Sequence, residues 1–183
     1  MPAISNNVRT FEWNSIERGF DELQWVLRAI AGKNDIRQNI QCLHIDEKFI
    51  VATDGHRLHL MDNTYDAPCG LWRPKTISKK AVAFEEQLDM EFPDYDRVFP
   101  THGNPVRESF NVSSGKESWG QRLAIPFLRV LTYTKQAFNI DYLLDAFSLN
   151  GDWAVESVGD HCLRPLVAMR SETCLAVLMP LKS

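Results

Sequence analysis

Histidines and cysteines are the side chains of this 183-residue sequence that most often bind metals or catalyse reactions, but their spacing indicates neither role. His56 and His59 lie three residues apart in a predicted strand, so they point to opposite faces and cannot share a metal ion. The cysteines contain no CxxC pair, which leaves a zinc ribbon or finger unsupported; they are Cys42, Cys69, Cys162 and Cys174. We therefore predict no metal and no other cofactor.

Catalytic motifs are equally poorly supported. Serine, histidine and aspartate are all present, but no G-x-S-x-G nucleophile elbow and no glycine-rich phosphate loop occurs. An enzyme built around Cys42, Asp54 and His56 is the least favoured hypothesis, because no catalytic spacing supports it. We predict that the chain is not an enzyme.

The composition is that of a globular protein with one domain or two small ones, since 44% of the residues are hydrophobic and 24% are charged. The formal charge of −4 argues against a protein that coats DNA with its whole surface, but allows contact through one face. No apolar stretch approaches the roughly 20 residues of a membrane span. Residues 1–4 lack the features of a signal peptide. We expect a cytoplasmic protein with reduced thiols and no membrane contact.

The first third of the chain predicts the order β-α-β-β-β. After a strand at 8–13, Asn14 and Glu17 have the spacing of a capping box. A helix over 15–31 follows, with one apolar stripe and Gly32 at its end; the stripe is Ile16, Phe20, Leu23, Leu27 and Ile30. Three strands come next, at 40–45, 49–53 and 57–61, and Asp54-Gly55 forms the turn between the last two.

The last third predicts the same order again. A strand at 130–133 precedes a helix that Asn139 caps and Asn150-Gly151 ends, and strands follow at 153–158, 163–169 and 174–179. We infer an internal duplication from this element order, because no residue-level identity between the halves supports it.

The middle of the chain, residues 66–129, reads as an inserted connector. It holds six of the nine prolines: Pro68, Pro74, Pro93, Pro100, Pro105 and Pro126. We expect a short helix at 77–87 with Ser78 as N-cap, and an exposed loop at 111–120. The fold class is therefore α+β: a single domain over 1–183 with a first half (1–65), a connector (66–129) and a second half (130–183).

Four strings carry a resemblance to a known family. They are ATDGHRL at 52–58, preceded by DIRQNI at 35–40; FPDYDRVFP at 92–100; FNIDYLLD at 138–145; and VLMPLK at 177–182. In this order they resemble the bacterial replicative sliding clamp, the β subunit of DNA polymerase III. The resemblance covers residues 14–60, 91–100 and 130–183, and it implies a DNA clamp-like domain.

The chain also departs from that family. A clamp protomer has three domains, each made of two β-α-β-β-β halves, and this chain is about half as long. Its first third resembles the front half of the family's middle domain, and its last third the back half of the final domain. A ring of six such domains would need six copies of this chain rather than two.

The resemblance implies a groove that receives short partner peptides with apolar anchors. Leu58, Val98, Val177, Met179 and Leu181 would supply apolar walls, and Arg57 and Arg97 would meet a peptide at the rim. The full set of matching positions is Thr53, Gly55, His56, Arg57, Leu58, Pro93, Arg97, Val98, Val177, Met179, Pro180 and Leu181.

DNA contact is the weaker implication. In the family, the helices line the hole and face the duplex, but here Asp141 and Asp145 lie on the second helix and would repel phosphates. Asp21 and Glu22 weaken the first helix in the same way. The candidate DNA-binding cations are Arg18, Arg28, Lys33 and Arg37, and in the connector Arg73, Lys75, Lys79 and Lys80.

The leading hypothesis is a non-enzymatic clamp-like protein of DNA replication or repair. It docks DNA polymerases or other replication and repair proteins through short linear motifs, and encircles duplex DNA as a homo-oligomer. The alternative is a monomeric peptide-binding module that competes for clamp-binding motifs, forms no ring and binds no DNA. The mass of the protein in solution separates the two.

Overall fold

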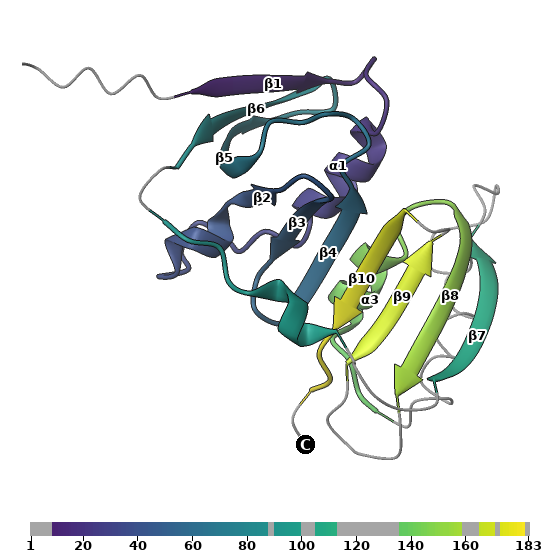
Figure 1. Cartoon of the computed structure of the whole chain (residues 1–183). Coiled ribbons are helices and arrows are strands. Elements are labelled where there is room, and N and C mark those ends of the chain that lie inside the picture. Colours follow the sequence, from purple (N-terminus) through teal and green to yellow (C-terminus); the bar gives the residue numbers. More distant parts are fainter. Residues whose placement is uncertain are drawn as a thin grey trace, which may run out of the picture.

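The computed structural model describes residues 9–87, 90–99, 105–112, 136–158, 165–170 and 173–181. Within them, ten antiparallel strands form one sheet with two helices against one of its faces (Figure 1). The strands are β1 (Thr10–Asn14), β2 (Leu43–Ile45), β3 (Phe49–Thr53), β4 (Arg57–Asp62), β5 (Gly70–Ile77), β6 (Ala81–Glu86), β7 (Pro105–Val112), β8 (Gly151–Val158), β9 (Leu166–Arg170) and β10 (Cys174–Leu178). The helices are α1 (Phe20–Leu27) and α3 (Ile140–Ala146), with short 3₁₀ turns η1 (Gln38–Gln41) and η2 (Tyr95–Val98).

The strand order joins the two halves of the chain edge to edge. It runs β1-β6-β5-β2-β3-β4-β10-β9-β8-β7, so the last strand of the first half pairs with the last strand of the second. In this central pairing, Leu58 lies opposite Val177 and Arg57 opposite Leu178. The α+β fold expected from the sequence is confirmed, and the two three-stranded meanders flank the β4–β10 seam in mirrored order.

Helix α1 is shorter than the sequence predicts. Gly19 begins it with φ +79°, a left-handed conformation that the interior of a helix does not allow. The predicted capping box forms only in part: the Asn14 backbone N–H donates to the Glu17 carboxylate at 2.5 Å, but the Glu17 N–H donates to the backbone carbonyl of Asn14 at 2.9 Å, and these bonds close a turn before the helix. The predicted helix over 15–31 is therefore wrong at its start, and Ile16, expected in the core, is 94% exposed. Beyond Leu27, only i→i−3 bonds continue the winding as far as Ile30.

The connector contains a hairpin where a helix was expected. Strands β5 and β6 pair with each other, and β5 also pairs with β2, while β6 pairs with β1. Ser78 caps no helix: its Oγ accepts from the backbone N–H of Ala81 at 3.0 Å and closes the β5–β6 turn. Burial alternates along β6, with Val82, Phe84 and Glu86 inward, so the period is that of a strand.

The second half agrees with its prediction more closely. Asn139 caps α3, because its side chain accepts from the backbone N–H of Asp141 at 2.9 Å. Strands β8, β9 and β10 fall within a few residues of the expected ranges. The expected strand at 130–133 lies outside the described residues. The strand that pairs with β8 is β7, in the region expected as connector and, at Asn111 and Val112, as loop.

Each face of the sheet carries its own apolar cluster. The helix face holds the larger one, which includes Trp25 and Leu23 of α1, Leu143 of α3 and Trp153 of β8. On the outer face, Val51, Leu58, Leu60, Val167 and Val177 pack against Phe92, Tyr95, Val98 and Phe99. Residues 90–99 therefore cross the outer face at the seam between the halves (Figure 1).

Candidate peptide-binding groove

Three segments that are distant in the sequence meet at one cavity of about 300 Å³ on the outer face. The β3–β4 hairpin, the 90–99 segment and the end of β10 each contribute to it. Its lining residues are Arg37, Asn39, Ile40, Thr53, Gly55, His56, Arg57, Leu58, Pro93, Asp94, Tyr95, Val98, Val177 and Met179. Every residue predicted for the groove lies in this lining except Arg97, Pro180 and Leu181.

The β3–β4 turn is held by its own side chains. The Asp54 carboxylate accepts from the backbone N–H of His56 at 2.9 Å and of Arg57 at 3.1 Å. The Thr53 hydroxyl donates to the carbonyl of Arg57 at 2.6 Å and accepts from the N–H of Gly55 at 3.0 Å. Gly55 adopts φ +87°, which side chains of L-residues disfavour. The sequence DGHR therefore builds one rigid wall of the cavity.

The apolar floor comes from β4 and β10. Leu58 and Val177 are cross-strand partners and both are buried. Met179 follows β10, donates its backbone N–H to the carbonyl of His56 at 2.9 Å, and is 40% exposed. A flexible, half-exposed thioether beside a buried aliphatic floor suits an apolar anchor from outside.

The 90–99 segment forms the opposite wall and is pinned at two points. The Tyr95 hydroxyl donates to Asp46 Oδ2 at 2.7 Å, and the Phe92 ring stacks on His44 with centroids 5.0 Å apart. Burial, and then the hydrogen bond to the Asp46 carboxylate, raise the pKa of Tyr95 above its ordinary value. Burial lowers the pKa of His44, against the attraction of Asp46. Both side chains therefore stay neutral at physiological pH and fix the wall in place.

The charged residues of the groove differ from expectation. Arg57, predicted at the rim, turns its side chain to the helix face, where it is 10% exposed and meets Asp145. Arg97 is exposed and pairs with Asp94 at 2.7 Å. Arg37, predicted for DNA contact, lines the groove and pairs with Asp35, and its hydrogen bonds lower the pKa of Asp35 to about 2.

Several lining residues were not predicted as groove residues: Asn39, Ile40, Asp94 and Tyr95. The signal for them was present, since all four lie in the DIRQNI and FPDY strings that carry the family resemblance. Pro180 and Leu181 lie just past Met179, and Leu181 donates its N–H to the carbonyl of Ala137 at 2.8 Å, so its backbone is tied to the segment before α3.

The candidate DNA-binding cations do not gather in one place. Only Arg28 and Lys79 line a common cavity among those described, about 410 Å³ on the helix face between α1 and the α3–β8 loop. Lys80 is exposed beside Lys79 in the β5–β6 turn, and Lys75 pairs with Glu85 at 2.5 Å. Lys33 is exposed after α1, and Arg73 is half-buried in β5.

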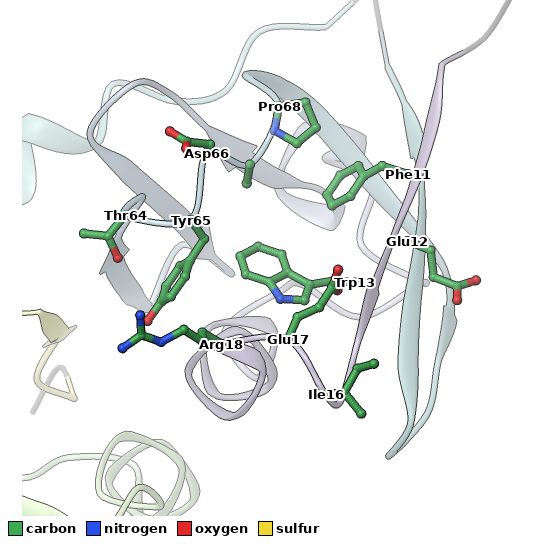
Figure 2. Close-up of a pocket in the computed structure, with 11 residues that line it drawn as sticks. Phe11, Glu12, Trp13, Ile16, Glu17, Arg18, Thr64, Tyr65, Asp66 and Pro68 are labelled. Atoms are coloured by element: carbon green, nitrogen blue, oxygen red, sulfur yellow. The ribbon is translucent and has the colours of Figure 1, made fainter.

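A larger cavity of about 810 Å³ lies at the β1 end of the sheet (Figure 2). Trp13 and Tyr65 meet edge to face across its floor, with centroids 5.7 Å apart. Arg18 lies on its rim near Tyr65, and exposed Ile16 is at the opposite side (Figure 2). This cavity is not part of the predicted groove.

Within the described ranges, no three histidine, cysteine, aspartate or glutamate side chains lie close enough together to hold a metal ion. No helix in the same part of the chain is long and apolar enough to cross a membrane.

No protein-family model and no curated protein sequence matches the chain. Solved structures do match. The DNA polymerase sliding clamp of Bacillus subtilis superposes with a TM-score of 0.60 at 16% identity, over 100% of this chain and 66% of that one. The β subunit of DNA polymerase III from Thermotoga maritima gives 0.59 at 14% identity, over 100% and 70%. The griselimycin-bound clamp of Bartonella birtlesii gives 0.56 at 17%, over 95% and 66%.

These matches establish the fold: the chain has the architecture of bacterial sliding clamps. It spans 66% of the length of the Bacillus subtilis clamp.

Proposed function

We propose that this chain is a non-enzymatic, clamp-like protein of DNA replication or repair that acts in the cytoplasm and docks polymerase-type partners through the groove. The observation that carries the proposal is the cavity at the seam. Residues of three separate family-like strings line it together, although nothing in their sequence spacing requires them to meet.

The chemistry of the groove supports a short linear peptide as its ligand. The floor of Leu58 and Val177 is apolar, Met179 is adaptable, and polar groups of His56 and Asp94 lie around it. An apolar anchor in a desolvated pocket with a polar surround is the usual arrangement of a binding hot spot. A leucine or phenylalanine side chain would fill the volume, and the exposed Arg97 would contact the flanks of the peptide.

The sheet edges support an oligomer that encircles DNA. β1 and β7 stand at the two ends of the strand order, and neither has a second neighbour among the described residues. Edges of this kind invite pairing between copies. The cavity beside β1 offers apolar contact area there, lined in part by Phe11, Trp13 and Tyr65 (Figure 2). A head-to-tail contact of β1 with β7 of another copy would extend the sheet.

The charge of the helices favours the alternative, a monomeric module that occupies clamp-binding motifs without a ring. Asp141 and Asp145 lie on α3, and Asp21 and Glu22 on the first turn of α1. A duplex that contacted these helices would meet carboxylates as well as Arg28.

Fluorescence anisotropy with a labelled clamp-binding peptide bearing Leu and Phe anchors tests the groove. Met179→Ala is expected to weaken peptide binding by about 1–3 kcal/mol, because it truncates a central anchor contact. Met169→Ala is the matched control: Met169 packs on the same outer face but does not line the cavity. Lys182→Ala, at a position outside the described residues, is expected to weaken peptide binding much less than Met179→Ala does. No binding by the wild-type protein, or equal losses for Met179→Ala and Met169→Ala, would reject the assignment.

A further inference from the structure

The carboxylate of Asp145 on α3 joins two arginines from the other half of the chain. Its Oδ1 accepts from Arg28 Nη1 at 2.9 Å, and its Oδ2 accepts from Arg57 Nη1 at 2.6 Å. Arg28 caps the end of α1, while Arg57 begins β4 within the groove hairpin. Asp145 does not line the groove, but it is bonded to Arg57, which does.

The Arg57 guanidinium bonds to groups of the same chain through all three of its nitrogens. Its Nε donates to Asp54 Oδ2 at 3.1 Å, its Nη1 to Asp145, and its Nη2 to the carbonyl of Arg28. The guanidinium lies over the Tyr142 ring of α3, 4.4 Å from its centroid. Because every nitrogen already has a partner, Arg57 has little capacity left to bind a peptide carboxylate, and its contribution to the groove is its position.

The backbone of Arg57 takes part in the hydrogen bonds that shape the hairpin wall. Its backbone carbonyl receives the Thr53 hydroxyl, its N–H goes to Asp54, and the neighbouring His56 carbonyl receives the N–H of Met179. The His56 ring also stacks on Tyr142, with centroids 6.5 Å apart. The backbone of Arg57 therefore belongs to the hydrogen-bond network that also holds His56 and Met179, and its guanidinium joins that network to Asp145 of α3.

We propose that Asp145 is a positioning residue for the groove: by holding Arg57 against α3, it keeps the β3–β4 wall in the shape that receives a peptide. This inference rests on the proposed function of the groove. The competing explanation is purely structural, namely that Asp145 ties α3 to α1 through Arg28 and leaves the groove unaffected.

Asp145→Asn keeps the shape of the side chain and removes its charge, so it loosens Arg57 without opening a void. A half-buried, charge-assisted pair of this kind predicts a roughly fivefold to thirtyfold rise in the peptide Kd. Asp141→Asn is the matched control on the same helix. Asp141 is exposed and contacts neither arginine, so its Kd is expected to stay within about twofold of wild type.

Two comparisons separate positioning from simple stabilisation. Arg28→Gln removes the other arginine that pairs with the Asp145 carboxylate, and it is expected to raise the peptide Kd less than Asp145→Asn does. In the Arg57→Gln background, Asp145→Asn is expected to cause no further loss, because the two residues act as one unit. Three results would overturn the proposal. The first is an unchanged peptide Kd in Asp145→Asn with only a lowered melting temperature. The others are equal losses of affinity in Asp145→Asn and Arg28→Gln, or full additivity of Asp145→Asn with Arg57→Gln.

A readout without peptide keeps the test independent of the proposed function. Amide hydrogen exchange over residues 53–58 is expected to accelerate in Asp145→Asn and to stay as in wild type in Asp141→Asn. If the wild-type protein binds no peptide but the exchange rates change as expected, the proposed function is wrong. The inference that Asp145 positions the β3–β4 hairpin is then still supported. Unchanged amide exchange over residues 53–58 in Asp145→Asn would overturn the inference that Asp145 positions the hairpin.

Discussion

The rings of Trp25 and His59 stack face to face between α1 and β4, with centroids 4.3 Å apart and planes within 14°. Both side chains are buried, at 1% and 0% exposure. His59 Nδ1 lies 2.9 Å from the carbonyl of Trp25, and Trp25 Nε1 donates to the carbonyl of Ala146 in α3 at 2.9 Å. Burial lowers the pKa of His59 to about 3. A neutral imidazole is therefore part of the packing where α1 meets the second half.

The first prediction is an acid sensitivity that His59 causes. Its folded pKa of about 3 lies below the unfolded value near 6.5, so the unfolded chain binds the extra proton first as pH falls. The stabilising effect of neutral His59 is present above pH 6.5 and is lost below it. The free energy of unfolding is expected to fall by about 1.4 kcal/mol per pH unit between these values. Urea unfolding measured from neutral pH downward gives this slope.

His59→Gln is expected to flatten the slope, since glutamine does not titrate and keeps a donor for the Trp25 carbonyl. His56→Gln is the matched control, because His56 is exposed in the β3–β4 turn. An identical pH slope in wild type and His59→Gln would show that other groups carry the acid sensitivity.

The second prediction concerns Gly55 in the groove hairpin. A Cβ at this position would lie 2.6 Å from Arg37 Nη1, on a backbone with φ +87°. Gly55→Ala is expected to destabilise the fold by about 1–2 kcal/mol, the cost of a left-handed alanine, and to weaken peptide binding as Arg37 moves. Gly32→Ala is the control, since nothing lies within 4 Å of its Cβ position. Chemical unfolding measures the free energy of unfolding of both variants. Equal values for Gly55→Ala and Gly32→Ala would contradict the expected backbone strain at position 55.

The hairpin and α3 could be predicted from the sequence because their signals are local. Asp54-Gly55 and Asn139 each satisfy backbone groups within three residues, so short-range patterns were sufficient. The inward direction of Arg57 was also predictable: Leu58 belongs to the outer face, and neighbouring residues of a strand alternate. Reading Arg57 as a rim cation neglected that alternation.

The errors arose where local signals were ambiguous. Ser78 has the same side-chain chemistry in a turn as at a helix N-cap, and only the alternation from Ala81 to Glu86 separates the two. Ile16 fits a helical stripe by spacing, but Gly19 begins the helix after it. The pairings of β1 with β6 and of β7 with β8 join distant segments, and no short-range pattern specifies them.

The third prediction is weak, salt-sensitive DNA binding that depends on the β5–β6 turn. Lys79 and Lys80 are exposed there, and the carbonyl of Ser78 accepts from Gln24 of α1 at 2.7 Å, which holds the turn against the helix face. Lys79→Ala with Lys80→Ala is expected to weaken binding and to lower the salt dependence, since each phosphate contact releases counterions. Lys75→Ala should matter less, because Lys75 is paired with Glu85.

Titration of a labelled duplex at several low salt concentrations measures this effect. Lys48→Ala is the control, an exposed lysine of the β2–β3 turn. Tight binding that survives replacement of Lys75, Lys79 and Lys80 together would place the DNA-binding surface elsewhere.

The last prediction concerns the free edge of β1. Glu86 donates its N–H to the carbonyl of Arg9, and Ser15 donates to the carbonyl of Lys80. Hydrogen-bonded positions alternate along an antiparallel pair, so the N–H of Glu12 points away from β6. Glu12→Pro therefore removes an outward donor and leaves the β1–β6 bonds in place. It is expected to abolish concentration-dependent association, while Glu12→Ala, which keeps the N–H, associates like wild type.

Light-scattering mass across a concentration series decides between the two forms of the proposed function. A wild-type mass that rises with concentration, and a Glu12→Pro mass that stays at one chain, would support pairing of copies through β1. Association that persists in Glu12→Pro would mean that copies meet through another surface. A wild-type protein that stays monomeric at high concentration would reject the ring. The alternative would then hold, in which a monomeric module uses the groove to compete for clamp-binding motifs.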